Sequence, residues 1–350
     1  MPEAHIPHIV TERDFDGPSL SGLTVGVVGY GSQGSAQALN LRDSGVEVSV
    51  GLRDGSPTAE SAVGAGFRVV EVGEAATADV VALLVPDEVL PHVFEHEMAP
   101  ALRVGQTLVL AHGFALLFGG LEAPDGIDVV LVAPMGPGAI LRERYTTGSG
   151  LPAAFAVHQD ATGNARRTAL EYGRAIGCAR VGLFETTVAE ETEIDLFAEQ
   201  AVLAGGVTRL IEAAFDVLVE AGYDPAMAYM ECLYELELTV NLVHRYGISG
   251  MRDRISHTAL FGDLTRGDRI IGEETRAGMR RVLEDVRSGV FARELEDDVS
   301  KRGEGTEAAL KAARERLLSR VEDAIAPVAH PNREDVSEGG QAGGGTSRKR

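Results

Sequence analysis

Short apolar runs alternate with polar, helix-like stretches through the first half of the chain. The runs are rich in β-branched residues and are bounded by turn-forming residues, as buried strands are. They lie at 24–29, 46–52, 67–72, 79–86, 106–113, 128–134 and 153–158. Between the first two runs, Ala36, Leu39 and Leu41 give residues 35–44 the apolar spacing of a helix. Continuous apolar strands separated by helices predict an α/β domain with a doubly wound parallel sheet that is covered on both faces.

After about residue 187 the pattern changes to long acidic stretches with almost no strand signal. We expect helices at 188–221, 225–246, 268–288 and 304–325. The final segment is polar and Gly-rich without apolar periodicity, which is typical of disorder. The predicted organisation is an α/β domain over 1–187, an all-α domain over 188–329 and a disordered tail over 330–350.

Composition narrows the class of protein. The chain has 350 residues, of which 44% are hydrophobic, so two domains can each bury a core. A formal net charge of -21 disfavours nucleic acid or an anionic membrane as partner, and a small anionic substrate would need local positive charge such as a metal ion. No apolar run is long enough to span a bilayer, and the N-terminus lacks the features of a secretory signal, so we expect a soluble, cytoplasmic protein. Cys178 and Cys232 have no partner motif and are expected to be packing residues.

A glycine-rich turn follows the first predicted strand. The segment GYGSQG consists of Gly29, Tyr30, Gly31, Ser32, Gln33 and Gly34. The first glycine permits a tight turn, the second lets the backbone approach a pyrophosphate, and the third allows close packing of helix on sheet. The N-terminus of the following helix then faces the phosphates. In this strand–turn–helix context the motif predicts a Rossmann domain that binds NAD or NADP.

Residues 53–58 follow the second strand, where the adenosine ribose of a bound dinucleotide would lie. Arg53, Ser56 and Thr58 suit a 2'-phosphate, whereas Asp54 suits a free 2'-hydroxyl. A solvated loop is the competing interpretation. The sequence therefore leaves NAD and NADP both open.

Two pairs of acidic residues recur four positions apart in the helical half. Asp195 and Glu199 form the first pair, and Glu231 and Glu235 form the second. This spacing puts both carboxylates of a pair on one helix face, where they repel each other unless a cation binds. Hard oxygen ligands without neighbouring His or Cys favour Mg²⁺ over zinc. A solvated acidic face is the alternative in so acidic a chain.

With these residues assembled, the sequence resembles a short-class (class I) ketol-acid reductoisomerase over most of residues 8–295. The matching stretches are GYGSQG at 29–34, ALNLRDSG at 38–45, GLRDGS at 51–56, LVPDEV at 84–89, AHGF at 111–114, GPG at 136–138, QDATG at 159–163, ETT at 185–187, EET at 190–192, DLF at 195–197, EQAVL at 199–203, ECLYEL at 231–236 and GMR at 250–252. The resemblance implies NADPH or NADH in the first domain and two Mg²⁺ ions between subunits in the second. It also implies a homodimer or a larger homo-oligomer with a shared site, in which an acetohydroxy acid is isomerised by alkyl migration and the resulting ketone is reduced.

The resemblance also assigns roles to single residues. Asp195 and Glu199 would bind metal from one subunit, and Glu231 and Glu235 from the other. Three residues would take part in catalysis: Glu231 again, Ser256 at the substrate carboxylate, and His112 near the nicotinamide and the metal-bound waters.

Several positions depart from the family pattern. Met135 stands where the family has a catalytic lysine, and a thioether can neither donate a proton nor carry a positive charge. The other departures are Ser35, Gln37, Ala115, Leu117, His257, Leu260 and Phe261. All lie near motifs, and none falls on a proposed metal carboxylate or fingerprint glycine. This distribution indicates a retained cofactor and metal scaffold with a remodelled substrate pocket.

Three functional hypotheses follow. The leading one is a divergent family member that acts on a hydroxy or dihydroxy acid in specialised, natural-product metabolism. It would retain hydride transfer but weaken or lose the alkyl shift, and a redox-neutral rearrangement or ring closure such as cyclopropanol formation is one plausible chemistry. The second is an ordinary ketol-acid reductoisomerase of branched-chain amino acid biosynthesis, converting 2-acetolactate to 2,3-dihydroxyisovalerate. The third is a catalytically inactive paralogue that binds nucleotide.

Overall fold

The computed structural model describes residues 8–329 as two compact units, the first ending at Thr192 and the second beginning at Glu193. The boundary lies inside a helix, a few residues beyond the break at 187 that the sequence indicates. The predicted tail over 330–350 lies outside the described residues.

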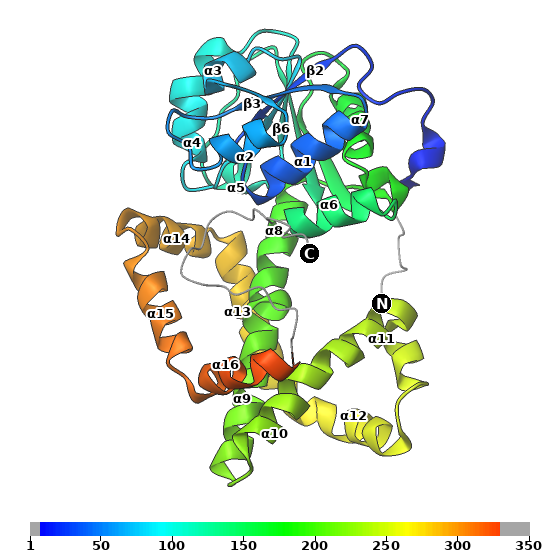
Figure 1. Cartoon of the computed structure of the whole chain (residues 1–350), viewed down its shortest axis with the longest axis vertical. Helices are drawn as coiled ribbons and strands as arrows, with labels where there is room; N and C mark the ends of the chain where they lie inside the picture. The colour runs from blue at the N-terminus through cyan, green and yellow to red at the C-terminus, as the bar shows by residue number, and fades with distance from the viewer. Residues whose placement is uncertain (1–7, 330–350) are drawn as a thin grey trace, which may run out of the picture. The chain divides into compact units, whose positions relative to one another are not determined.

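The first unit is built on a nine-stranded sheet (Figure 1). Its strands are β1 (Ile9–Val10), β2 (Thr24–Val28), β3 (Glu47–Gly51), β4 (Arg68–Val70), β5 (Val80–Leu83), β6 (Thr107–Leu110), β7 (Asp128–Pro134), β8 (Ala153–Gln159) and β9 (Leu183–Glu185). They lie in the order β1-β9-β8-β7-β6-β5-β2-β3-β4. Strands from β4 across to β7 are parallel, which confirms the predicted fold class. The remaining edge departs from the all-parallel expectation, because β8 runs antiparallel to β7 and β1 antiparallel to β9.

Alternate residues of each central strand enter opposite cores. Val80 and Ala82 of β5 pack into one core, whereas Val81 and Leu83 pack into the other. The first core is covered by α1 (Ser32–Asp43), α2 (Ala59–Gly64), α6 (Gly138–Thr146) and α7 (Ala165–Ala175). The second core is covered by α3 (Val72–Ala75), α4 (Leu90–Val93), η2 (Phe94–Met98) and α5 (Phe114–Leu117). Burial on both faces explains why these strands have continuous rather than alternating apolar runs.

The second unit is helical, as expected. It comprises the C-terminal part of α8 (Val188–Ala198), η5 (Glu199–Leu203), α9 (Gly205–Glu220), α10 (Pro225–Tyr229), η6 (Met230–Tyr234), α11 (Glu235–Arg252), α12 (His257–Ile270), α13 (Glu273–Arg287), α14 (Val290–Ser300), α15 (Glu304–Arg314) and α16 (Leu317–Ala329). One small core forms where Phe215, Tyr229 and Leu318 meet. By contrast, α11 and α12 bury no residue within the described chain.

Two turns of this unit are π-helical rather than α-helical, namely η5 and η6. In η5 the backbone N–H of Ala204 donates to the carbonyl oxygen of Glu199, five residues back. Glycines permit this path, because a Cβ on Gly206 would stand 2.0 Å from the carbonyl oxygen of Ala201. Single π turns inside α-helices are frequent at functional sites.

Candidate active site

The glycine-rich turn lies where the strand order of the sheet reverses. From β2 the chain continues to β3 and β4 on one side, and then returns to β5 on the other side of β2. Ligands of such sheets bind at the carboxyl ends of the strands beside this switch point. The parallel strands β2, β5, β6 and β7 bring the segments that follow them to the same edge. These segments carry the fingerprint turn, Asp87, His112 and Met135.

Contacts of the three fingerprint glycines explain their spacing. Gly29 has φ +97, and a Cβ there would stand 2.5 Å from the carbonyl oxygen of Leu84, the residue that follows the neighbouring strand β5. A Cβ on Gly34 would stand 2.3 Å from the carbonyl oxygen of Gly29, so close packing of α1 on the turn requires glycine. A Cβ on Gly31 would meet no atom within 4 Å, which leaves room for a phosphate to approach.

The other residues of the turn have different surroundings. The side chain of Tyr30 is buried, with its ring edge-on to Phe67 at 5.8 Å, and burial raises its pKa. Ser32 Oγ instead accepts the backbone N–H of Gly138 at 3.2 Å, and Gln33 Nε2 donates to the carbonyl oxygen of Gly136 at 3.0 Å. The turn is therefore bound to the segment after β7.

The loop after β3 remains open to solvent. The side chain of Arg53 is exposed, and within residues 8–329 it forms no ion pair. The hydroxyls of Ser56 and Thr58 lie 3.1 Å apart. Asp54 in the same loop is also exposed. The loop therefore presents groups suited to a 2'-phosphate and a group suited to a free 2'-hydroxyl.

His112 lies just after β6 and faces Asp87 from the loop after β5. Its Nδ1 lies 3.8 Å from a carboxylate oxygen of Asp87 and accepts the backbone N–H of Phe114 at 3.3 Å. Sequence reasoning did not select Asp87, although its position directly after a Pro at the end of a buried strand is a usable signal. The ring of His112 is only partly exposed.

Met135 stands at the end of β7 with 54% of its surface exposed. Its backbone N–H donates to the carbonyl oxygen of Pro152 at 2.9 Å, which fixes the main chain at this position. The thioether therefore occupies a solvent-accessible position beside the fingerprint turn, at the edge of the sheet where ligands bind.

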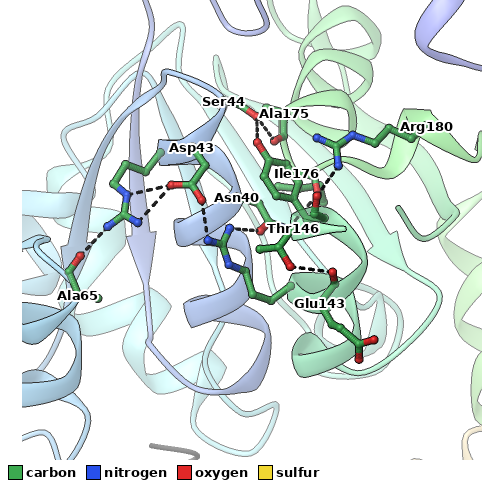
Figure 2. Close-up of polar contacts among 12 residues, drawn as sticks. Asn40, Asp43, Ser44, Ala65, Glu143, Thr146, Ala175, Ile176 and Arg180 are labelled. Carbon is green, nitrogen blue, oxygen red and sulfur yellow. Dashed lines mark hydrogen bonds and ion pairs between the residues drawn. The ribbon is translucent and has the colours of Figure 1, made fainter. Parts of the chain in front are cut away.

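Helix α6, which begins three residues after Met135, is anchored along α1 (Figure 2). Arg142 donates to Asn40 Oδ1 at 2.8 Å and to Asp43 Oδ2 at 2.6 Å. The Asn40 amide in turn donates to the carbonyl oxygen of Ile176 at 3.0 Å. These bonds hold α6 against α1, the helix that follows the glycine-rich turn, so the two helices form one layer.

In the second unit, each carboxylate pair has one member in a π-helical turn and the other in the adjoining α-helix. Asp195 lies in the last turn of α8 and is half-buried, and Glu199 is the exposed first residue of η5. Glu231 lies in η6 and Glu235 begins α11, and both are exposed. Within residues 8–329 no basic side chain pairs with Glu231 or Glu235. Burial, and then the charge of Glu231, raise the pKa of Cys232. These hard carboxylate oxygens have the chemistry that Mg²⁺ requires.

Ser256 is the N-cap of α12, where its Oγ accepts the backbone N–H of Ala259 at 3.1 Å. That bond uses a lone pair and leaves the hydroxyl hydrogen available to a ligand. Two further properties hold for residues 8–329. No group of three or more His, Cys, Asp or Glu side chains is gathered closely enough to hold a metal ion, and no helix is long and apolar enough to cross a membrane.

Comparisons with known proteins cover nearly the whole described chain. Residues 19–182 match the NADPH-binding domain of acetohydroxy acid isomeroreductase, and residues 188–328 match the C-terminal domain of ketol-acid reductoisomerase. A solved NADH-preferring ketol-acid reductoisomerase from an uncultured archean is 39% identical, with a TM-score of 0.88, and the match covers 92% of this chain and 99% of that one. A semialdehyde dehydrogenase NAD-binding protein from Cupriavidus necator shares the fold at 19% identity, with a TM-score of 0.54 over 74% of this chain and 99% of that one. The chain therefore belongs to the ketol-acid reductoisomerase family of NAD(P)-dependent oxidoreductases.

Proposed function

We propose that this enzyme uses NAD(P)H and two Mg²⁺ ions to transfer hydride to or from a hydroxy, dihydroxy or keto acid, without efficient alkyl migration. The observation that carries the proposal is Met135, an exposed thioether where the family has a lysine. General acid–base groups contribute about 10² to 10⁴ in rate, so this loss falls on whichever step needs the lysine's proton or charge. Hydride transfer depends on the dinucleotide turn, whose glycine contacts are intact.

When bound, the nicotinamide would supply the hydride, and Mg²⁺ would polarise the oxygens of the acid. The chain's own residues would position both. The turn at 29–34 would hold the pyrophosphate, and the loop at 53–58 the ribose. The backbone N–H of Phe114, which donates to Nδ1 of His112, would hold the imidazole ring in place near the reacting carbon. Ser256 would donate a hydrogen bond to the substrate carboxylate.

The four carboxylates fit a magnesium site because they are hard ligands on accessible helix positions. We propose that Asp195 and Glu199 act together with Glu231 and Glu235 from a second copy. The unburied faces of α11 and α12 support association, since they expose Leu238, Val240, Tyr246, Ile248, Phe261, Leu264 and Ile270. Exposed apolar surface of this extent is characteristic of an obligate interface. The partner is therefore a second copy of this chain, and the assembly is a homodimer or a larger homo-oligomer.

The apolar departures point to a changed substrate. Leu260 is partly buried and Phe261 exposed on α12, and Ala115 and Leu117 lie on α5. These four side chains replace polar residues of the family pattern, so the positions near the substrate become less polar. We infer that the substrate is an acid of specialised metabolism rather than 2-acetolactate. A redox-neutral cycle would fit this site. NAD(P)⁺ held by the turn at 29–34 would accept hydride from the hydroxyl-bearing carbon, the enolate of the resulting ketone would close a ring by displacing a neighbouring leaving group, and return of the hydride to the ketone would restore NAD(P)⁺.

A substrate screen tests the proposal. The protein would be incubated with Mg²⁺ and each nicotinamide cofactor, and with panels of 2,3-dihydroxy acids, acetohydroxy acids and sulfonium-bearing diols. Consumption that requires Mg²⁺ and is lost in Asp195→Asn and in Glu231→Gln supports the proposal. Full activity of both variants would refute the metal assignment, and no turnover with any acid would favour a nucleotide-binding paralogue.

A further inference from the structure

A directional chain of hydrogen bonds runs from the core of the first unit to the segment that carries Met135. The Tyr172 hydroxyl lies 2.8 Å from Gln37 Oε1, Gln37 Nε2 lies 3.0 Å from Gln33 Oε1, and Gln33 Nε2 lies 3.0 Å from the carbonyl oxygen of Gly136. Tyr172 on α7 and Gln37 on α1 are both fully buried. This series of hydrogen bonds therefore crosses helices α7 and α1 before it reaches the loop after β7.

The end of this chain fixes the direction of every bond in it. A carbonyl oxygen can only accept, so Gln33 must present its NH₂ group to Gly136 and its oxygen to Gln37. Gln37 must then donate to Gln33, which leaves its own oxygen to accept from Tyr172. Burial raises the pKa of Tyr172, so its hydroxyl keeps the proton that this arrangement requires. If either glutamine amide were rotated by 180°, two acceptor oxygens would face each other. The series of hydrogen bonds therefore allows one orientation of each amide.

The segment at the far end is held from both sides. On one side the backbone N–H of Met135 donates to the carbonyl oxygen of Pro152 at 2.9 Å. On the other side Gln33 and Ser32 bind Gly136 and Gly138. Of these contacts, only the one through Gln33 is connected to a buried polar network.

We propose that Gln37 and Tyr172 are positioning residues that hold residues 134–138, and with them Met135, against the dinucleotide-binding turn. Losing a partner leaves a buried polar group unsatisfied, which costs about 1–3 kcal/mol. Without Gln37, Gln33 Oε1 has no donor. Gln33 then either keeps its bond to Gly136 with this oxygen unsatisfied, or rotates and releases residues 134–138 from the turn. A displacement of about 1 Å near reacting groups can cost up to about 10²-fold in rate. The consequence for turnover rests on the function proposed above, whereas the hydrogen-bond chain does not.

Amide hydrogen exchange of the holoenzyme, resolved by peptide mass spectrometry, tests the proposal. Gln37→Met removes both bonds at similar side-chain volume, and Gln37→His restores them, because a neutral imidazole has one donor and one acceptor nitrogen. Gln106→Met is the matched control, since Gln106 is also a buried glutamine, but its amide donates to the carbonyl oxygens of Ala76 and Ala78 rather than toward residues 134–138. Tyr172→Phe is a second route if Gln37→Met does not fold.

In Gln37→Met and Tyr172→Phe we expect the amides of Met135, Gly136 and Gly138 to exchange about tenfold faster, with exchange in β2 and β8 unchanged. Gln37→His and Gln106→Met should leave the exchange of this segment within about twofold of the parent. For a substrate that the parent turns over, kcat should fall at least about fivefold in Gln37→Met and should return toward the parent value in Gln37→His. Equal acceleration across the whole first unit, or unchanged exchange at 135–138, would overturn the proposal. If the parent turns over no acid, the proposed function fails and the exchange pattern alone decides whether the chain holds the segment.

Discussion

Gly138 begins α6 in direct contact with Ser32: a Cβ placed on Gly138 would stand 2.0 Å from the carbonyl oxygen of Ser32. The colliding atom belongs to the backbone, so rotating a side chain cannot relieve it. The loop after β7 and the dinucleotide-binding turn therefore share one surface, and the space between them admits only glycine.

Gly138→Ala should accordingly separate the loop from the turn. Overpacking of this kind costs about 1–3 kcal/mol, and we expect a melting temperature several degrees lower together with weaker dinucleotide binding. Calorimetry and titration with NADH and NADPH would measure both effects. Gly64→Ala in α2 is the matched control, because a Cβ there meets nothing within 4 Å and the substitution should be neutral or stabilising. Parent-like behaviour of Gly138→Ala would mean that the two segments are not in contact in solution.

Arg53→Ala tests the loop after β3. The exposed guanidinium would attract a 2'-phosphate through charge-assisted hydrogen bonds, whereas a free 2'-hydroxyl gains little from it. We expect the Kd for NADPH to rise about tenfold and the Kd for NADH to change less than about twofold, whichever cofactor the parent prefers. Equal weakening for both cofactors would show that Arg53 does not contact the 2'-position.

Gly206→Ala tests whether the π-helical turn η5 sets the position of Glu199. The added Cβ would lie 2.0 Å from the carbonyl oxygen of Ala201, which forces the turn toward another register. The concentration of Mg²⁺ needed for half-maximal activity should rise about tenfold or more, as found when groups that support a metal ligand are disturbed. Gly278→Ala in α13, where the nearest atom to an added Cβ is the end of the flexible Arg281 side chain at 3.8 Å, serves as the control. An unchanged Mg²⁺ requirement in Gly206→Ala would show that the π-helical turn η5 does not position Glu199 for metal binding.

Acid stability of the first unit should depend on Asp79. The backbone N–H and hydroxyl of Thr24 both donate to the Asp79 carboxylate, at 2.9 and 2.8 Å, and hold its pKa below the usual range. A lowered native pKa stabilises the fold above the unfolded value of about 3.9, and this contribution disappears as pH falls through the native pKa. Asp79→Asn should lower the melting temperature by about 1–3 °C at pH 7, and the difference should vanish near pH 2. A constant difference across that range would contradict the assignment.

Local patterns predicted the sheet well and the helical unit less well, for physical reasons. Strand β7 was predictable because both of its faces are buried, but the apolar pattern of β8 contains no information about strand direction. Helix α12 was not fully predicted, since it contains two glycines and its apolar residues pack against nothing within the described chain. The π turns were not predicted, because an i, i+4 spacing was interpreted with α-helical geometry.

In the candidate site, too, local sequence patterns predict some features, whereas others depend on the fold. The fingerprint glycines were predictable because their roles follow from a local backbone path, and the glycine contacts in the structure agree with those roles. The contact between His112 and Asp87, and the bond between Gln37 and Tyr172, join residues from different segments of the chain. No local pattern specifies such pairs, so only the fold could bring them together.

In the function proposed above, hydride transfer is retained and alkyl migration is inefficient, because Met135 replaces the lysine of the family. The most direct test compares two substrates with Mg²⁺ and NAD(P)H: 2-acetolactate, which must rearrange before reduction, and 3-hydroxy-3-methyl-2-oxobutanoate, which is already rearranged. We predict Mg²⁺-dependent reduction of the second at least about tenfold faster than of the first, and a Met135→Lys variant that gains activity only on 2-acetolactate. Turnover of 2-acetolactate by the parent protein at the rate of the rearranged acid would show instead that alkyl migration is efficient without the lysine.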